Sequence, residues 1–398
     1  MILSKIGQSA VLVHLKMQNK KIRVFIIAGE VSGDVLGARI MRQMADAEFI
    51  GIGGQNMAAA GLQSVFPMDD LSVMGVIEVV ANARTLMRRV RQTVDEIIRT
   101  RPDIVLTIDS PGFARSVIGK LRKSRAGREM IAGGLRFHHV VAPQVWAWRP
   151  GRAKKYARTF DKLYAFFDFE VPYFTQYGLD TVAVGHPIAD AIIGKYTHRD
   201  TDNGQKIITL VPGSRISEVK RLMPLFEQVA GIIASSGYTG YRFAIPTVQT
   251  TAKYVADAVR TWGFPVELVS ADARYDLYAK TYVAIAASGT VSAELAMMHV
   301  PAVVVYRMNP ITVWLARRVI NVRWVSLVNI LLGRGVYREC LGGDATSANI
   351  MDAFGQLTIP SVRAKMVAEL QSADGMWRRD AGDAAALIAD GVRAAAIA

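Results

Sequence analysis

The chain has 398 residues, of which 51% are hydrophobic and 21% are charged. This composition excludes global disorder, and the length exceeds one ordinary core, so two domains of roughly 150–200 residues each are the default expectation. The formal net charge of +14 favours an anionic partner, either nucleic acid, a membrane surface or a phosphorylated substrate. The single cysteine, Cys340, excludes an intrachain disulfide, and a reducing compartment is the simple interpretation.

The N-terminal segment has the features of neither a signal peptide nor a membrane span. Lys5, His14 and Lys16 interrupt its apolar residues, and no small-residue cleavage site follows. Residues 1–20 are therefore expected to form an N-terminal extension. No uninterrupted apolar run in the sequence is long enough to cross a bilayer, which takes about 18 residues or more.

Short apolar, β-branched runs alternate along the chain with segments of helical periodicity. This alternation predicts an α/β fold of two Rossmann-like, doubly wound parallel-sheet domains, with the carboxyl ends of both sheets facing a central cleft. The predicted strands are 22–28, 103–109, 138–142, 163–167, 206–211, 241–246, 266–270, 282–288 and 301–307. A polar segment separates the two series of strands. The expected domains are 21–192 and 193–365, followed by a helical tail, 366–398.

The turn "AGEVSGD", residues 28–34, joins the first predicted strand to a helix. Gly29 and Gly33 would allow a ligand to approach the backbone closely. Glu30 and Asp34 would then lie at the ligand-binding end of the sheet, as candidate substrate-binding residues. An ordinary turn with an acidic helix start explains the same pattern, and the residues alone leave both interpretations open.

Three other patterns are weak signals. The glycine cluster 51–61 is a poor dinucleotide motif because Asn56 interrupts it. The six histidines show no metal-ligand spacing, and no cysteine cluster exists. The triplet Asp200-Thr201-Asp202 lies in the polar linker, where we expect it to be solvated. The sequence therefore predicts neither a bound metal nor another cofactor.

Residues 73–96 have the pattern of an amphipathic helix with one apolar and one basic stripe. Such a helix can lie in a membrane interface, although packing into the core with solvated arginines explains the pattern equally well. The residues expected to contact lipid are Val76, Val79, Val80, Leu86, Met87, Arg84 and Arg88. The segment 311–333, which combines tryptophans with arginines, is a second candidate.

Asp109 ends an apolar strand just before a Ser-Pro-Gly turn. A carboxylate at that position can take a proton from an acceptor hydroxyl, although a helix N-cap is the plainer explanation. Further along, Trp146 and Trp148 flank one alanine and precede a run of arginine and lysine. Indoles favour interfaces, so we expect these residues to serve a membrane or an anionic substrate.

Two turns of the second predicted domain suit phosphate. In "PGSRISEV", residues 212–219, Ser214 is expected to cap a helix and Arg215 to offer a fork of donors to phosphate. A capped helix with a solvated arginine is the alternative interpretation.

The second of these turns lies in "ASGTVSAEL", residues 287–295. Ser288, Gly289 and Thr290 open a helix whose N–H groups suit a diphosphate. Glu294 lies one helical turn beyond Thr290, where it could hold the ribose hydroxyls of a nucleotide. A salt-bridged Glu294 on an ordinary amphipathic helix is the alternative.

Taken in chain order, these motifs resemble those of the lipid-A-disaccharide synthases, glycosyltransferases of bacterial outer-membrane lipid assembly. The matching stretches are "AGEVSGD" (28–34), "GIGGQNM" (51–57), "LSVMGVIEVV" (71–80), "IDSPGF" (108–113), "APQVWAWRPGR" (142–152), "VGHPIAD" (184–190), "PGSRISEV" (212–219), "ASGTVSAEL" (287–295), "VVYRMNPITVWLARR" (304–318) and "VSLVNILLGR" (325–334). The resemblance implies a GT-B architecture. It implies transfer from UDP-2,3-diacylglucosamine to 2,3-diacylglucosamine 1-phosphate, with inversion, to give a β-1′,6-linked disaccharide 1-phosphate and UDP.

The resemblance also implies roles for single residues. Asp109 matches the position of the proposed general base, and Asn329 matches a position that the family needs for activity. Arg215 and the helix start at 288–290 would steady the departing UDP, while Glu294 would hold its ribose. Glu30 and Asp34 match a turn near the acceptor.

One departure concerns the turn after Asp109. The family often has a second carboxylate where this chain has Gly112. Asp109 is therefore the only base that this turn can supply, which weakens any mechanism that needs a pair.

The implied partners are the two lipid substrates and the cytoplasmic face of the inner membrane, with peripheral attachment and no nucleic acid. A homodimer is left open. Two rival interpretations are a soluble UDP-sugar 2-epimerase-like enzyme of the same architecture and a basic nucleic-acid-binding protein without catalysis. Steeply salt-dependent binding to DNA or RNA without UDP binding would favour the second rival.

Overall fold

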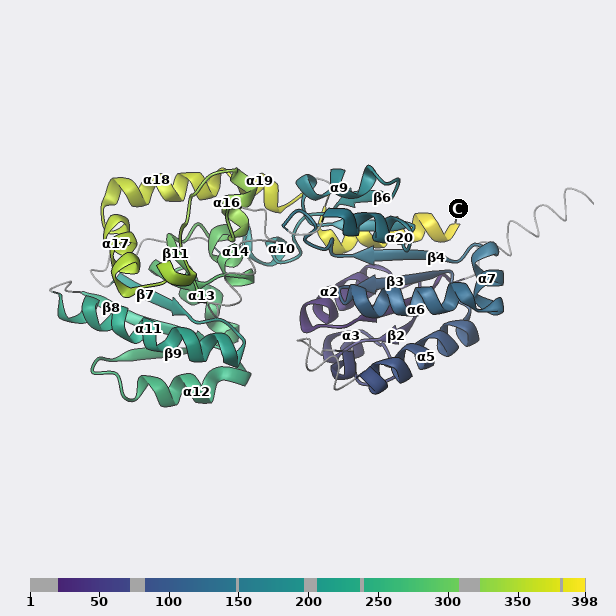
Figure 1. The fold of residues 1–398 in the computed structure, drawn as a ribbon, viewed down its shortest axis with the longest axis horizontal. Helices are drawn as coiled ribbons and strands as arrows, with labels where there is room; N and C mark the ends of the chain where they lie inside the picture. The colour runs from purple at the N-terminus through teal and green to yellow at the C-terminus, as the bar shows by residue number, and fades with distance from the viewer. Residues whose placement is uncertain are drawn as a thin grey trace, which may run out of the picture. The chain divides into compact units, whose positions relative to one another are not determined.

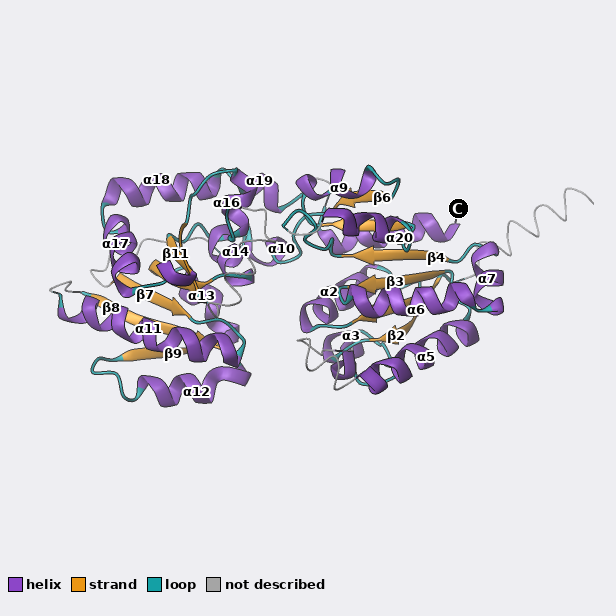
Figure 2. Cartoon of the chain, in the orientation of Figure 1, coloured by secondary structure: helices purple, strands orange, loops and turns teal. Residues whose placement is uncertain are grey.

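The computed structural model describes residues 21–71, 83–147, 150–196, 206–236, 240–307, 323–379 and 382–397. These residues form two compact units, and Figure 1 shows their ribbons with the chain coloured from its N-terminus to its C-terminus. Each unit contains one six-stranded parallel sheet with helices around it (Figure 2), which confirms the predicted α/β fold of two doubly wound domains.

The first unit contains β1 to β6 and, from the far end of the chain, α20. Its strands are β1 (Arg23–Ala28), β2 (Glu48–Ile52), β3 (Ile104–Ile108), β4 (Arg136–Val140), β5 (Lys162–Ala165) and β6 (Asp180–Ala183). Its helices are α2 (Val31–Gln43), α3 (Gln55–Ala59), η1 (Met68–Leu71), α5 (Ala83–Thr100), α6 (Pro111–Lys123), α7 (Arg125–Ala132), η2 (Pro150–Arg152), α8 (Ala153–Ala157), η3 (Asp168–Glu170), α9 (Pro172–Thr175) and α20 (Ala384–Ile397).

The strand order of the first sheet is β2-β1-β3-β4-β5-β6. From β1 the chain runs outward to β2 and then returns to β3 on the other side of β1. Because crossovers between parallel strands are right-handed, α2 and α5 lie on opposite faces of the sheet. The loops after β1 and β3 therefore part in opposite directions, and such a switch point is where open α/β sheets bind ligands.

The second unit contains β7 to β12. Its strands are β7 (Lys206–Val211), β8 (Tyr241–Thr247), β9 (Val266–Ser270), β10 (Thr281–Ala287), β11 (Ala302–Tyr306) and β12 (Arg338–Leu341). Its helices are α10 (Ala189–Ile192), α11 (Ile216–Ser235), α12 (Gln249–Val259), η4 (Ala271–Ala273), α13 (Arg274–Tyr278), α14 (Thr290–Met297), α16 (Leu327–Leu332), η5 (Gly342–Asp344), α17 (Ser347–Leu357), α18 (Pro360–Gln371) and α19 (Asp374–Trp377).

The second sheet repeats the topology of the first in the order β12-β11-β10-β7-β8-β9. Here the chain moves outward from β7 to β9 and then returns to β10, on the other side of β7. The same handedness places α11 and α14 on opposite faces of the sheet. The switch point of this unit thus lies between the carboxyl ends of β7 and β10, where the two predicted phosphate turns begin.

Each unit has its own apolar core. The strands of the first sheet are buried against its helices, and Ala385, Ile388 and Val392 of α20 belong to that core. Figure 1 shows α20, in yellow, within the first unit. The predicted tail is therefore divided, because α18 and α19 lie with the second unit and α20 with the first. Among the described residues, none of the helices combines the length and apolar character needed to cross a membrane.

The described part of the predicted amphipathic segment is α5. Val76, Val79 and Val80 lie outside the described residues, as do Trp148 and 308–322. Leu86 is partly buried and packs against the first core, which favours the core-packing alternative for this residue. Met87 is 55% exposed, and Arg84 and Arg88 are exposed as well.

Candidate active site

The predicted residues of the first unit gather where β1 and β3 end. These strands pair in parallel with Ala28 opposite Ile108, so Glu30 and Asp109 leave the sheet at the same edge. A Cβ atom on Gly29 would lie 1.9 Å from Ser110 Oγ. Only glycine therefore lets these two turns touch, and their contact brings the two carboxylates into one site.

Asp109 has an unusual backbone and a perturbed carboxyl group. Its φ of 58° and the 45° of Ser110 are left-handed values that L-residues rarely adopt. Burial, followed by the nearby Glu30 carboxylate, raises the pKa of Asp109 to about 6, although a backbone hydrogen bond at Ser110 opposes the shift. A carboxyl group tuned in this way is suited to proton transfer near neutral pH. The family often has a second carboxylate at the position of Gly112. In this chain Glu30, which lies in a different turn, supplies a second carboxylate near Asp109.

The carboxylate of Asp34 is directed at the start of α3. It is 2% exposed, and both of its carboxylate oxygens accept hydrogen bonds at the start of α3. The donors are Gly54 N at 2.7 Å, Met57 N at 3.0 Å, and Asn56 N and Nδ2 at 2.9 Å each. Asp34 thus holds the glycine turn of α3, and this geometry favours a structural role over the predicted contact with substrate. The close packing also explains Gly54, whose Cβ would lie 2.8 Å from Asp34 Oδ2.

Tyr156 lies within electrostatic range of Asp109 and of two arginines. Burial raises the pKa of Tyr156 to about 12, while Arg152 and Arg115 lower it and Asp109 raises it, so these groups lie within electrostatic range of one hydroxyl. Trp146 is partly buried and is grouped with the second unit. Neither Tyr156 nor Arg115 belongs to a motif that the sequence alone singles out.

Val31 and Val35 form an exposed apolar strip at the start of α2. They are 70% and 45% exposed; Val31 directly follows Glu30, and Val35 lies one helical turn beyond Val31. Exposed valines beside a polar site are a further feature that the motif analysis missed.

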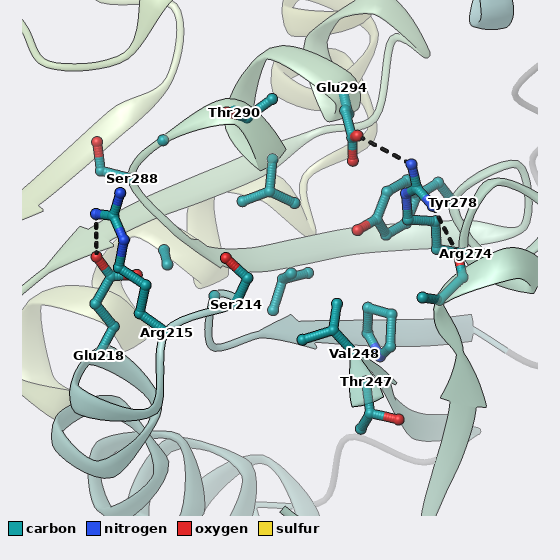
Figure 3. A pocket seen from close by; sticks show the side chains of 17 residues that line it. Ser214, Arg215, Glu218, Thr247, Val248, Arg274, Tyr278, Ser288, Thr290 and Glu294 are labelled. Atoms are coloured by element: carbon teal, nitrogen blue, oxygen red, sulfur yellow. Dashed lines mark hydrogen bonds and ion pairs between the residues drawn. The ribbon is translucent and has the colours of Figure 1, made fainter. Parts of the chain in front are cut away.

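In the second unit the predicted residues line one cavity of about 390 Å³ (Figure 3). Figure 3 shows Ser288, Arg215 and Glu218 on one side of the cavity and Arg274, Tyr278 and Glu294 on the other. All six predicted residues of this unit's switch point line it, namely Ser214, Arg215, Ser288, Gly289, Thr290 and Glu294.

The helix α14 begins at Thr290 with Gly289 as its N-cap, as predicted. Gly289 has a φ of 143°, which glycine adopts more readily than other residues. The N-terminal turn of α14 thus faces the cavity directly after a buried strand, β10. An N-terminus in this position attracts anions through its N–H groups and the helix dipole.

Glu294 is buried, with 7% exposure, and two groups of α13 fix its carboxylate. Tyr275 donates its hydroxyl proton to Glu294 Oε1 at 3.1 Å, and Arg274 Nη2 lies 3.4 Å from the same oxygen. Arg274 Nη2 also donates to the hydroxyl of Tyr275 at 2.7 Å. Burial and the Glu294 carboxylate raise the pKa of Tyr275. Sequence reasoning missed both partners because the segment around α13 carries no recognisable motif.

Arg215 lies at the N-cap of α11, and its side chain is 61% exposed. Its Nη1 is 3.3 Å from Glu218 Oε1. The predicted cap by Ser214 is wrong, because the helix begins one residue later and no side chain caps it. Ser214 accepts a hydrogen bond from Thr250 Oγ1 through its carbonyl group instead. The guanidinium of Arg215 remains at the mouth of the cavity, where it can contact phosphate.

Asn329 is fully buried in α16 and makes four hydrogen bonds within the protein. Nδ2 donates to Tyr337 O at 2.8 Å and to Glu339 Oε1 at 2.9 Å. Oδ1 accepts from Val336 N and Tyr337 N at 2.8 Å each. The amide thus uses both donors and both lone pairs within the protein, which favours a positioning role over the predicted direct role in catalysis. Asn329 positions the turn that leads into β12.

We predict that Asn329→Ala destabilises the protein. The variant leaves buried N–H and carbonyl groups without partners, and each such group costs about 1–3 kcal/mol. The midpoint of urea unfolding should therefore fall clearly below that of the wild type. Asn349→Ala, which removes an exposed amide on α17, serves as the control with little expected change. A wild-type unfolding midpoint combined with lost turnover would return Asn329 to a direct role in catalysis.

Comparisons with known proteins agree with this arrangement. The family model described as lipid-A-disaccharide synthetase matches residues 24–372. The lipid-A-disaccharide synthase of Rhodospirillum centenum is 42% identical over 361 residues, which cover 87% of this chain and 88% of that protein. The lipid-A-disaccharide synthase of Gluconobacter oxydans is 37% identical over 345 residues, which cover 84% of this chain and 81% of that protein.

Solved structures with the same fold include two proteins of other families. The UDP-GlcNAc 2-epimerase from Neisseria meningitidis bound to UDP-GlcNAc has a TM-score of 0.59 at 12% identity, covering 94% of this chain and 100% of that one. MurG from Acinetobacter baumannii has a TM-score of 0.57 at 12% identity, and the match covers 94% of this chain and 99% of that one. At these identities the likeness shows the fold alone, which is the GT-B class.

Proposed function

Because the chain belongs to the lipid-A-disaccharide synthetase family, we propose that it joins UDP-2,3-diacylglucosamine to 2,3-diacylglucosamine 1-phosphate. The chain is a hexosyltransferase of lipid A biosynthesis, as its resemblance to the family predicted. The observation that carries the proposal is a family match over most of the chain, with both sets of predicted turns at the switch points of their sheets.

Neither rival interpretation has comparable support. Similarity to the epimerases is confined to the fold, at 12–15% identity, whereas the synthases are 33–42% identical over most of the chain. A basic nucleic-acid-binding protein without catalysis does not fit membership of an enzyme family.

On the donor side, we place UDP in the cavity of the second unit. The diphosphate would lie at the start of α14 and be contacted by Arg215, since both offer donors to anionic oxygen. Glu294 would accept hydrogen bonds from the ribose hydroxyls. Its carboxylate is already held in place by Arg274 and Tyr275, so ligand binding would cost little side-chain entropy.

On the acceptor side, Asp109 would take the proton of the 6-hydroxyl as that oxygen attacks the anomeric carbon of the donor. The bond from this carbon to the diphosphate oxygen breaks as the new bond forms, so the configuration inverts. Arg215 and the start of α14 would stabilise the negative charge that develops on the departing UDP. Burial, followed by like-charge repulsion from Glu30, would keep Asp109 basic enough by raising its pKa.

The acyl chains need an apolar surface, and the exposed Val31 and Val35 beside Glu30 offer one. We further propose that the enzyme attaches peripherally to the cytoplasmic face of the inner membrane through residues 73–96. Both substrates carry acyl chains, which partition into bilayers at roughly 0.8 kcal/mol per buried CH₂. An enzyme bound to the membrane surface would therefore meet its substrates where they are concentrated.

The proposed function is tested by the dependence of UDP release on each lipid. Purified protein should release UDP from UDP-diacylglucosamine at a high rate only when diacylglucosamine 1-phosphate is present. Equal UDP release without the acceptor would indicate a hydrolase, and no release with both lipids would refute the transferase.

We predict that Val79→Ser combined with Met87→Ser raises the soluble fraction of the protein roughly tenfold, because each change removes apolar surface that would enter the membrane interface. Sedimentation with anionic vesicles measures the partition. Ile359→Ser with Met376→Ser, two exposed apolar residues of the second unit, is the matched control. If the two double variants partition alike, residues 73–96 are not the membrane anchor.

A further inference from the structure

A second concave site lies in the first unit, between α6 and the turn that follows α8. Its volume is about 360 Å³. Arginine side chains from both elements line it, namely Arg115, Arg122 and Arg158, and its lining contains no aspartate or glutamate. Three cations around one hollow, without an acidic residue in its lining, form a strongly positive pocket.

Two glycines help to form the hollow. Gly112 and Gly119 both line the pocket, and a Cβ atom added to either would meet nothing within 4 Å. Arg115, Gly119 and Arg122 follow one another at spacings of four and three residues, so they share one face of α6. The small residues therefore leave room for a ligand group between arginines of adjacent turns.

Arg122 is held in place against the pocket wall. Its Nη1 donates to Arg158 O at 3.2 Å and its Nη2 to Thr159 O at 2.9 Å. Its guanidinium carbon lies 5.3 Å from the centroid of the Phe137 ring. Arg115 and Arg158 are exposed, and across the described part of the chain neither forms an ion pair with a carboxylate. One arginine thus shapes the pocket, and two present their charge to it.

We propose that this pocket binds the phosphate group of the acceptor sugar. The inference rests on the proposed function, which leaves one anionic group without a site. The donor diphosphate is placed in the second unit, whereas the acceptor carries a phosphate on C1 and reacts through its 6-hydroxyl. Arginine forks match phosphate oxygens in geometry and charge.

The position of the pocket fits this assignment. The helix α6 begins at Pro111, directly after the turn that holds Asp109, and Gly112 in its first turn lines the pocket. The charges of Arg115 and Asp109 both shift the pKa of the Tyr156 hydroxyl, so the two residues lie in the same region. An acceptor with its phosphate among the arginines would extend toward the carboxylate that takes its proton. The same helix would then fix both ends of the acceptor.

The test is the double variant Arg115→Ala with Arg158→Ala, which leaves the wall residue Arg122 in place. The KM for the acceptor should rise at least tenfold, because each lost charge-assisted hydrogen bond weakens phosphate binding. The KM for the donor should stay within about twofold. Arg115→Lys with Arg158→Lys should restore part of the acceptor affinity. Lys120→Ala with Lys123→Ala removes two exposed charges from the same helix outside the pocket and should leave both KM values unchanged.

A binding experiment separates this inference from the proposed function. Phosphorus NMR should show glucosamine 1-phosphate binding to the wild-type protein and not to the double alanine variant, whether or not the protein turns over. If the wild-type protein binds glucosamine 1-phosphate but shows no turnover with both lipids, the transferase is refuted and the phosphate pocket stands. Normal turnover with an unchanged acceptor KM in the double variant would overturn the pocket alone. A double variant that loses only its affinity for phosphatidylglycerol vesicles would overturn it as well, and would assign the arginines to membrane phosphate.

Discussion

Replacing Asp109 with asparagine is expected to lower turnover by a factor of about 10² to 10⁴, the usual contribution of a positioned general base. Asparagine has nearly the same shape but cannot accept the proton of the acceptor hydroxyl. UDP binding should persist, because the cavity assigned to UDP lies in the second unit. Measurements of kcat and of UDP affinity by calorimetry test the two statements separately. Turnover like that of the wild type would exclude Asp109 as the base.

The same carboxyl group predicts a pH dependence. A base must be ionised, and the pKa of Asp109 is raised to about 6, so kcat/KM should fall as the pH drops below that value. Asp109→Asn should lack this fall in kcat/KM at acidic pH, and Glu30→Gln should move it to lower pH by removing a like charge.

The raised pKa of Asp109 also predicts how stability depends on pH. Ionised Asp109 destabilises the folded state above about pH 6, whereas below about pH 3.9, the usual pKa of an unfolded aspartate, the carboxyl group is protonated in both states and has no such effect. Asp109→Asn should thus raise the melting temperature at pH 7.5 and change it little at pH 3.5. A melting temperature lowered at both pH values would indicate a structural role instead.

Replacing Arg215 with alanine is expected to lower kcat by about 10² to 10³, because a donor aimed at the departing diphosphate acts most strongly in the transition state. Stability should hardly change, since the side chain is 61% exposed and its described ion pair, with Glu218, is at the surface. Steady-state kinetics with both substrates saturating measures the effect.

Arg242→Ala is the matched control for Arg215, because Arg242 belongs to the same unit and forms a similar exposed pair with Glu267. This control should retain full activity. If Arg215→Ala and Arg242→Ala lower kcat equally, Arg215 does not stabilise the leaving group.

The central strands were predictable from the sequence and three edge strands were not. Buried parallel strands are almost purely apolar, as in "IVLTI" of β3, and the sequence shows them directly. The missed strands β2, β6 and β12 each lie at the edge of a sheet. They are short, and they contain charged or small residues, such as "RECL" of β12, because an edge strand is covered on fewer sides.

The candidate site was predictable in its turns but not in its contacts. Local patterns identified the segments after β1, β3, β7 and β10, because a glycine or an acidic residue after a buried strand is visible in the sequence. The approach of Glu30 to Asp109 depends on Gly29 meeting a distant turn. Motif matching also assigned Asp34 to substrate and Asn329 to catalysis, whereas both side chains accept hydrogen bonds from backbone N–H groups within the protein. A residue required for activity and a residue that touches substrate look the same in a motif.

The identity of the product tests the central claim most directly. Purified protein would be incubated with UDP-2,3-diacylglucosamine and 2,3-diacylglucosamine 1-phosphate, with and without EDTA, and the lipid product analysed by mass spectrometry and proton NMR. We predict a tetraacyl disaccharide 1-phosphate with a β-1′,6 linkage, formed with one equivalent of UDP in both reactions. An α-linked product, or free diacylglucosamine without disaccharide, would contradict an inverting transfer by this chain.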